Sequence, residues 1–338
     1  MQIIKRLNIM SEVKNYFRIF ATVVFIFMAL AVSGQTIDEA KELYNEGGNA
    51  VQEGNLELGV QKFEECVSIC EILYDEEEDV DAEELMMTVQ QSLPKMYLQL
   101  SQSKAKAKDF EGGLEYSLKA KESANYVGDD DVAKKAASLA SKIYYANGYK
   151  KFKASDMEGA VKELDNSISE NEKNFKSHLL KIVILKDMGN EEALIVATRE
   201  VMAVNANDAN RDKAIATTAN YFLKDGAAAK QSAEYDKAIK QLNTSLEFDN
   251  DNTEAYYLLA TIYNTQKNWD KAIEAANTGL SHESSVGDES ARFNYELGNA
   301  YFGKGNKEQA CSAFTKAAVG SYAENANYQI EHVVKCSE

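Results

Sequence analysis

The residues best suited to acid–base, nucleophilic or metal chemistry are few and widely spaced. The three histidines, His178, His282 and His332, lie far apart in the sequence, and none has a carboxylate at the H-E-x-x-H spacing of zinc proteases. No G-x-S-x-G nucleophile elbow occurs, and the G-K-G triplet at 303–305 matches neither a phosphate-binding loop nor a dinucleotide-binding fingerprint. We therefore expect a protein without enzymatic activity, metal ion or cofactor.

One acidic run, at 75–84 (DEEEDVDAEE), offers several carboxylates of the kind that bind calcium. It lacks the alternating ligands and the central glycine of an EF-hand loop. We interpret the run as a solvated connection between two helices, with Asp79 or Asp81 capping the second helix.

Composition narrows the class of protein further. The chain has 338 residues, of which 45% are hydrophobic, and this is enough for a sizeable buried core. Acidic residues outnumber basic ones by 54 to 37, which gives a formal net charge of -17. Nucleic acid is excluded as a partner because the chain lacks the basic surface that neutralises phosphates. The single proline, Pro94, argues against proline-punctuated β-sandwiches and Pro-rich linkers.

The first 33 residues have the pattern of a secretory signal peptide. Basic side chains precede an uncharged apolar stretch at 19–32 (IFATVVFIFMALAV), and small residues follow it. A stretch of this length spans about 21 Å as a helix, which is less than the ~30 Å of a bilayer core. We expect cleavage between Ser33 and Gly34 and an exported protein, periplasmic or secreted, without membrane insertion after cleavage. An uncleaved N-terminal anchor is the alternative.

Two neighbouring segments in the last third of the chain repeat one pattern. They are 252–280 (NTEAYYLLATIYNTQKNWDKAIEAANTGL) and 291–320 (ARFNYELGNAYFGKGNKEQACSAFTKAAVG). On the first helix, the shared positions hold a bulky, a small and an aromatic residue. An aromatic residue precedes the second helix, along which small and bulky residues follow. In the first segment these are Tyr256, Ala260, Tyr263, Trp269, Ala272, Ala276 and Gly279. In the second they are Gly298, Tyr301, Ala310, Phe314 and Ala317. The segments resemble tetratricopeptide repeats, each of which is a helix pair.

Carried along the chain, this resemblance implies an all-α fold of an exported bacterial protein over residues 34–338. The implied architecture is a right-handed α-solenoid of about seven helix pairs. Small residues on the second helix of each pair set the register, at Gly59, Gly113, Ala160, Ala193, Ala238, Ala272 and Ala310. Each pair alone leaves one face unburied, so neighbouring pairs must stack and the ends of the stack need caps.

The spacing also predicts three long helices, at 80–107, 129–153 and 208–231. Pro94 is expected to kink or restart the first of them. A capping helix is expected at 322–336, with Tyr328, Val333 and Val334 facing inward and the acidic side chains facing solvent.

The resemblance implies a concave groove lined by the first helix of each pair. In the last two repeats this register places six residues in the groove: Tyr257, Thr261, Asn264, Tyr295, Asn299 and Phe302. Only Asn299 fits the asparagine of the clamp with which some members bind a C-terminal carboxylate, so we do not expect that specificity. The alternative is that the aromatic rings pack into the stack, because aromatic residues at helical spacing usually belong to a core.

The four cysteines form an even set in a protein expected to be exported, where disulfides persist. Cys66 and Cys70 share a predicted helix four residues apart, a spacing at which their side chains diverge, so we expect packed thiols. Cys311 lies on the second helix of the last repeat and Cys336 closes the capping helix. A disulfide between Cys311 and Cys336 would tie the cap down, but antiparallel packing puts Cys336 several residues past the level of Cys311. Both outcomes therefore stay open.

The expected function is a non-enzymatic scaffold of the bacterial envelope that binds a protein or peptide segment in the concave groove. The alternative is a structural subunit of an envelope assembly that dimerises or docks through its long helices and outer surface. An enzyme or a glycan-binding protein with a hidden site is the third interpretation, and no constellation of residues supports it. The oligomeric state is left open.

Overall fold

The computed structural model describes residues 36–283 and 287–336, and the expected signal peptide at 1–33 lies outside these ranges. The described residues are almost entirely helical and include no strand. The expected all-α fold class is confirmed. Within the described ranges, no helix is both long and apolar enough to cross a membrane.

The chain forms two compact units, of which one ends at Ala140 and the other begins at Ser141. The first unit holds two complete helix pairs. Their helices are α2 (Ile37–Gln52), α3 (Leu56–Glu77), α4 (Val80–Lys106) and α5 (Phe110–Val127). Helix α2 packs on α3, and α4 packs on α5. Pro94 lies inside α4, which runs through it as one helix, so the helix does not restart there.

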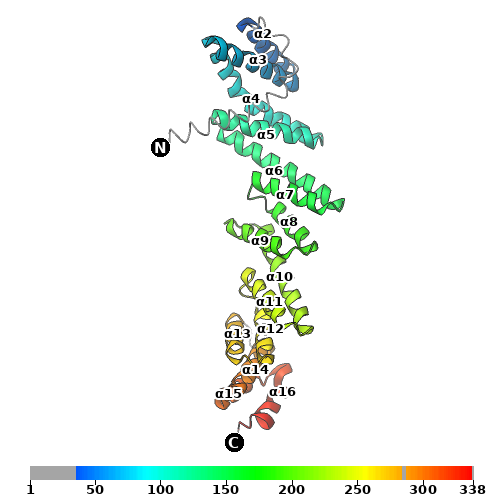
Figure 1. The fold of residues 1–338 in the computed structure, drawn as a ribbon, viewed down its shortest axis with the longest axis vertical. Coiled ribbons are helices and arrows are strands. Elements are labelled where there is room, and N and C mark those ends of the chain that lie inside the picture. The colour runs from blue at the N-terminus through cyan, green and yellow to red at the C-terminus, as the bar shows by residue number, and fades with distance from the viewer. Residues whose placement is uncertain (1–35, 284–286, 337–338) are drawn as a thin grey trace. The chain divides into compact units, whose positions relative to one another are not determined.

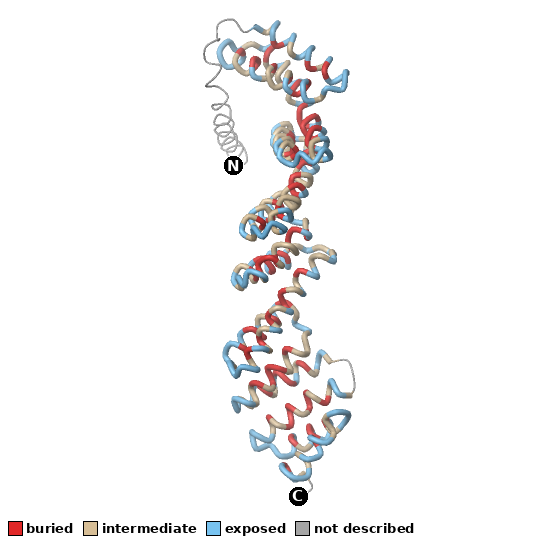
Figure 2. Tube along the Cα trace, turned by 90° about the vertical axis from the view of Figure 1, so that its right-hand side faces the viewer, coloured by how far each residue is buried: buried red, intermediate tan, exposed pale blue. Residues whose placement is uncertain are grey.

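The second unit begins within a long helix, α6, and continues the pattern of pairs (Figure 1). Its paired helices are α6 (Asp130–Lys153), α7 (Met157–Glu170), α8 (Phe175–Asp187), α9 (Glu191–Ala203), α10 (Ala209–Gln231), α11 (Tyr235–Phe248), α12 (Thr253–Thr265), α13 (Trp269–His282), α14 (Asp288–Gly303) and α15 (Lys307–Ala317). In each unit the buried residues lie where consecutive helices meet (Figure 2). Helices α4, α6 and α10 correspond to the three expected long helices.

Short polar side chains start the second helix of most pairs. Each accepts a hydrogen bond from the backbone N–H three residues further on, which satisfies a donor that the helix leaves unpaired. These N-caps include Asn55, Asp109, Asp156, Asn190 and Asn306. In every pair but the fourth, the expected small residue follows the N-cap by four positions.

The fourth pair differs from its expected register by one residue. Asn190 caps α9, and the residue four positions later is Leu194, which is fully buried. Ala193, the expected anchor, is only partly buried. Leu194 follows Ala160 by 34 residues, which is the period of tetratricopeptide repeats. Leu194 therefore gives a more regular spacing than Ala193 does.

Within a pair, the two helices approach closely at a small residue on the first helix. In the last pair, a Cβ atom added at Gly298 of α14 would lie 2.6 Å from the ring of Phe314 of α15. In the fifth pair, a Cβ atom at Gly226 would lie 2.8 Å from the side chain of Leu242. Phe314 and Leu242 are fully buried. Each large side chain therefore fills the space that the missing Cβ atom leaves.

Buried hydroxyl groups join helices of the second unit, both within the third pair and between neighbouring pairs. Ser167 Oγ of α7 donates to the carbonyl oxygen of Ser141 of α6 at 2.7 Å, and lies 2.7 Å from Ser177 Oγ of α8. Thr198 Oγ1 of α9 and Thr218 Oγ1 of α10 are also 2.7 Å apart. All five side chains are fully buried. Because a hydroxyl both donates and accepts, these contacts satisfy polar groups between helices without a buried charge.

The segment after α15 is less regular than the expected single capping helix. It consists of a 3₁₀ turn η1 (Gly320–Tyr322), a short helix α16 (Ala323–Tyr328) and a π-helical turn η2 (Gln329–Val333). Val334 is buried, but Tyr328 is 58% exposed and Val333 is 38% exposed. The expectation that these last two face inward was wrong, because it assumed one helical period through the whole segment. The buried positions are Ala326 and Val334. Ile330, which lies between them in the sequence, is partly buried and packs against the cluster that contains Val334.

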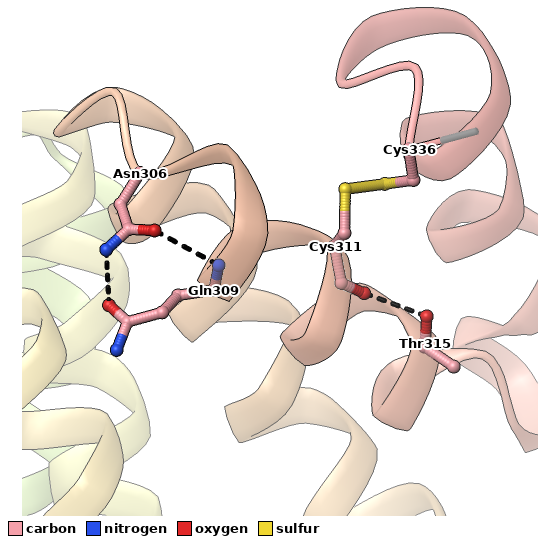
Figure 3. The surroundings of a disulfide bond; sticks show 5 residues. All are labelled: Asn306, Gln309, Cys311, Thr315 and Cys336. Carbon is pink, nitrogen blue, oxygen red and sulfur yellow. Dashed lines mark hydrogen bonds between the residues drawn. A yellow bond between two sulfur atoms is a disulfide. The ribbon is translucent and has the colours of Figure 1, made fainter. Parts of the chain in front are cut away.

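A disulfide joins Cys311 of α15 to Cys336 at the end of this cap (Figure 3). The hydroxyl of Thr315 donates to the carbonyl oxygen of Cys311 at 2.8 Å. Cys66 and Cys70 are free thiols, buried within α3. The cap is thus held to the last pair both covalently and by its own small apolar contacts.

The close approach at Gly298 leads to a stability prediction. Gly298→Ala should lower the free energy of unfolding of the last pair by about 1–3 kcal/mol, because the new methyl group collides with the buried Phe314 ring. Gly48→Ala is the control, since a Cβ atom there meets nothing within 4 Å and the change should stabilise α2 by about 0.5–1 kcal/mol. Thermal denaturation followed by circular dichroism measures both effects. Equal melting of the Gly298→Ala variant and the parent protein would contradict the close approach.

Candidate functional site

The candidate site lies on the first helices of the last three pairs, α10, α12 and α14. Helix α12 contacts both α10 and α14, because first helices of successive pairs lie next to each other. We call one set of side chains on these three helices the first-helix face. It comprises Lys230, Tyr257, Thr261, Asn264, Arg292, Tyr295, Glu296, Asn299 and Phe302.

Tyr257 of α12 lies near two cationic side chains. Lys230 Nζ is 6.0 Å from its ring centroid, and the guanidinium carbon of Arg292 is 5.0 Å from it. The ring of Phe293 meets Tyr257 edge to face, with centroids 6.1 Å apart. Burial raises the pKa of Tyr257, and its hydrogen bond with Tyr322 raises this pKa further. The phenol is therefore neutral at physiological pH, and much of its ring is engaged in contacts within the chain.

Tyr295 of α14 is engaged in a similar way. Its ring lies edge-on to Phe314, with centroids 5.5 Å apart, and 5.7 Å from the ring of Tyr322. Tyr322 comes from the cap, and its hydroxyl is 3.3 Å from the hydroxyl of Tyr257. Tyr257, Tyr295 and Tyr322 thus form one cluster, in which Tyr322 contacts both of the others.

A nearly buried carboxylate lies next to this cluster on α14. Glu296 is 7% exposed, and the side-chain amide of Asn264 donates to its Oε2 at 2.6 Å and to its carbonyl oxygen at 3.0 Å. Burial raises the pKa of Glu296, while hydrogen bonds from Asn264 and Asn299 and the charge of Lys230 act in the opposite direction. The two asparagines thus converge on one acidic side chain of their own chain.

The remaining two expected residues have different surroundings. Thr261 Oγ1 donates to the carbonyl oxygen of Tyr257 at 2.8 Å, so its hydroxyl hydrogen is used within α12. Phe302 lies near the end of α14 and is 43% exposed, more than any of the other five expected residues. The six residues lie on two contacting helices, with the tyrosines meeting Tyr322 and the asparagines meeting Glu296.

Sequence reasoning missed four residues of this region, for different reasons. Lys230 and Arg292 occupy positions that the repeat register exposes, so the same reasoning extended to α10 and to the start of α14 would have found them. Glu296 lies between two expected groove positions, and its spacing gave no signal. Tyr322 lies outside the repeats, so no repeat pattern could have placed it.

The three histidines do not form a catalytic group with one another. His178 is buried on α8, with Nε2 2.9 Å from the carbonyl oxygen of Glu172, and burial lowers its pKa. His282 stacks on Tyr256 with centroids 5.7 Å apart, and His332 lies in the cap. Across the described residues, no group of three His, Cys, Asp or Glu side chains is arranged to hold a metal ion.

The burial of Glu296 predicts a pH-dependent stability. A carboxyl whose pKa is raised on folding costs stability when it is ionised, so this cost appears as the pH rises through the folded-state pKa and vanishes in acid. Glu296→Gln keeps an acceptor for Asn264 and removes the charge. The variant should melt at a higher temperature than the parent protein at pH 7, and the difference should shrink as the pH falls to about 4. Melting curves between pH 4 and 8 test this, and a difference that does not change with pH would contradict it.

Parts of this chain match protein-family models and resemble solved structures. Two tetratricopeptide repeat models match it, one over residues 229–284 and the other over residues 291–318. The comparison with curated protein sequences gives no match. The solved structure of the MamA protein is 23% identical, with 57% of this chain and 95% of that chain covered and a TM-score of 0.29.

Two further solved structures cover more of this chain at lower identity. A tetratricopeptide repeat protein from Parabacteroides merdae is 12% identical and covers 87% of this chain and 98% of its own, with a TM-score of 0.28. The P58(IPK) TPR domain is 11% identical and covers 90% of this chain and 81% of its own, with a TM-score of 0.32. At these identities the likeness concerns the fold alone. Only residues 229–284 and 291–318 match tetratricopeptide repeat models, and these two stretches carry Tyr257, Asn264 and Glu296.

Proposed function

We propose that this protein is a non-enzymatic scaffold that binds a segment of a partner protein along the first-helix face of its last three repeats. The observation that carries the proposal is the overlap between this face and the repeats that the family models match. Tetratricopeptide repeats are protein-interaction modules, and their first helices present side chains at a regular spacing.

The chemistry of the first-helix face suits a peptide segment. Phe302 offers an exposed apolar ring, and Asn299, which gives one amide hydrogen to Glu296, keeps its second amide hydrogen and its oxygen. An extended or helical segment needs apolar anchors for its side chains and polar partners for its backbone. The excess of acidic residues in the chain favours a partner segment that is neutral or basic, because opposite charges speed association.

We also propose that the scaffold works outside the cytoplasm, in the periplasm or as a secreted protein. The basic and apolar pattern of the first 33 residues supports this location. The disulfide between Cys311 and Cys336 supports it independently, since structural disulfides persist in oxidising compartments and are rare in the cytosol.

A photocrosslinking experiment tests the binding face. With p-benzoylphenylalanine in place of Phe302, ultraviolet light should join the protein in its native cells to a discrete partner, identified by mass spectrometry. The matched control carries the same group in place of Lys316, an exposed residue on the second helix of the same pair. We then expect Phe302→Ala to weaken binding of that partner about tenfold, because aromatic anchors contribute on the order of 1–2 kcal/mol. Equal crosslinking from both positions would refute a specific role for this face.

The location is tested at the N-terminus of the expressed protein. When the full chain is made in a secreting bacterium, intact-mass and N-terminal analysis should find a mature protein that starts at Gly34 or within two residues of it. A protein that keeps Met1 or Met10 and stays in the membrane fraction would show an anchor instead.

A further inference from the structure

The chain turns back onto the first-helix face after its last repeat. Beyond α15, the backbone N–H of Ser321 donates to Asp288 Oδ1 at the start of α14, at 3.1 Å. Gly320 has a positive φ of 53°, and a Cβ atom there would collide with Asp288 Oδ1. A glycine fits this point best, because a side chain here would displace the Asp288 carboxylate that accepts the hydrogen bond from Ser321.

Tyr322, which follows α15 in the sequence, contacts two first helices. Its ring lies 5.7 Å from that of Tyr295 on α14, and its hydroxyl lies 3.3 Å from that of Tyr257 on α12. Helix α12 belongs to the repeat before the last one. A side chain that follows the last repeat and contacts both first helices lies across α14 on the first-helix face, where a bound segment would lie.

The cap does not depend on Tyr322 for its attachment to the last repeat. Val334 is buried in the cluster of Ala310 and Phe314, and the disulfide joins Cys336 to α15. These contacts hold the end of the cap whether or not the ring of Tyr322 lies on the first-helix face. The ring is partly exposed, so it can leave its place without opening a core.

We propose that Tyr322 is a tethered occupant of the first-helix face, holding the place between Tyr257 and Tyr295 that an aromatic side chain of the partner segment takes on binding. This inference rests on the proposed function and adds the chemistry of the partner and a means of regulation. The partner segment carries a tyrosine preceded by small residues, as the sequence Gly320-Ser321-Tyr322 does. The phenol hydrogen-bonds Tyr257, and a backbone N–H beside it meets Asp288.

A tethered occupant weakens the binding of a free competitor in a calculable way. A short tether gives an effective concentration on the order of millimolar. If the free segment binds with a dissociation constant of about 0.1 mM, the tethered tyrosine lowers its apparent affinity about tenfold. Removal of the Tyr322 ring should restore the intrinsic affinity.

The test uses a fluorescent peptide with the sequence of residues 316–325 (KAAVGSYAEN) as the probe, titrated with the full chain in its disulfide-bonded form. Fluorescence anisotropy gives the affinity for the parent protein and for Tyr322→Ala, Tyr322→Phe and Tyr328→Ala. Tyr328→Ala is the matched control, because it removes a ring from the same cap at a position that is 58% exposed. A second peptide, with alanine in place of its tyrosine, reports whether the ring is recognised.

We expect Tyr322→Ala to bind the probe about tenfold more tightly than the parent protein does, and Tyr328→Ala to bind it as the parent protein does. Tyr322→Phe keeps the ring and loses the hydroxyl, so it should bind the probe with an intermediate affinity. This variant keeps the test valid even if Tyr322→Ala loses the structure of its cap. The alanine peptide should bind none of the proteins.

Three outcomes would overturn the inference. If all four proteins bind the tyrosine peptide equally, Tyr322 does not compete for the face, although the face still binds segments. If the tyrosine peptide binds neither the parent protein nor a stably folded Tyr322→Ala variant, the cluster does not recognise tyrosine. Binding of the alanine peptide as tightly as the tyrosine peptide would likewise show that the ring is not recognised. Failure of the proposed function itself appears separately, as equal photocrosslinking from positions 302 and 316.

Discussion

The close approach of two helices at a small residue is the constraint on which the rest of this structure depends. A glycine on the first helix of a pair admits a large side chain of the second, as Gly47 admits Phe63 in the first unit and Gly298 admits Phe314 in the second. Once the two axes are this close, the opposite face of each helix must be covered by the next pair. The first helices then come to lie side by side, and this places Tyr257 and Tyr295 on neighbouring helices.

Sequence reasoning worked where one physical period governs a long segment. Repeat spacing and small residues gave the helix pairs, and the longer intervals between repeats gave the long helices α4, α6 and α10. It lost the register in the fourth pair because Ala193 is as small as the other anchors, while the N-cap Asn190 carried the stronger signal. The cap was mistaken because its backbone changes from 3₁₀ to α to π geometry within a few residues, so a single period could not describe it.

Part of the candidate site was predicted from the sequence. The rest was not, because it depends on contacts between segments that are distant in the sequence. The register named residues on two helices that contact each other, because position within a repeat determines which side of a helix faces its neighbours. It could not show that Asn264 binds Glu296, since the two side chains come from different helices and the pairing depends on how closely these pack. The position of Tyr322 depends on a single glycine conformation after the last repeat, which no repeat pattern encodes.

The apolar cluster that α10 shares with the fourth pair has a consequence for how that pair completes its core. Phe175, Ile182 and Leu194 of the fourth pair share one apolar cluster with Ala219 and Phe222 of α10. When the chain emerges N-terminus first, α8 and α9 have no completed core until residues 209–231 have followed them. The apolar side chains of the fourth pair therefore stay without their full set of partners until the fifth pair is made.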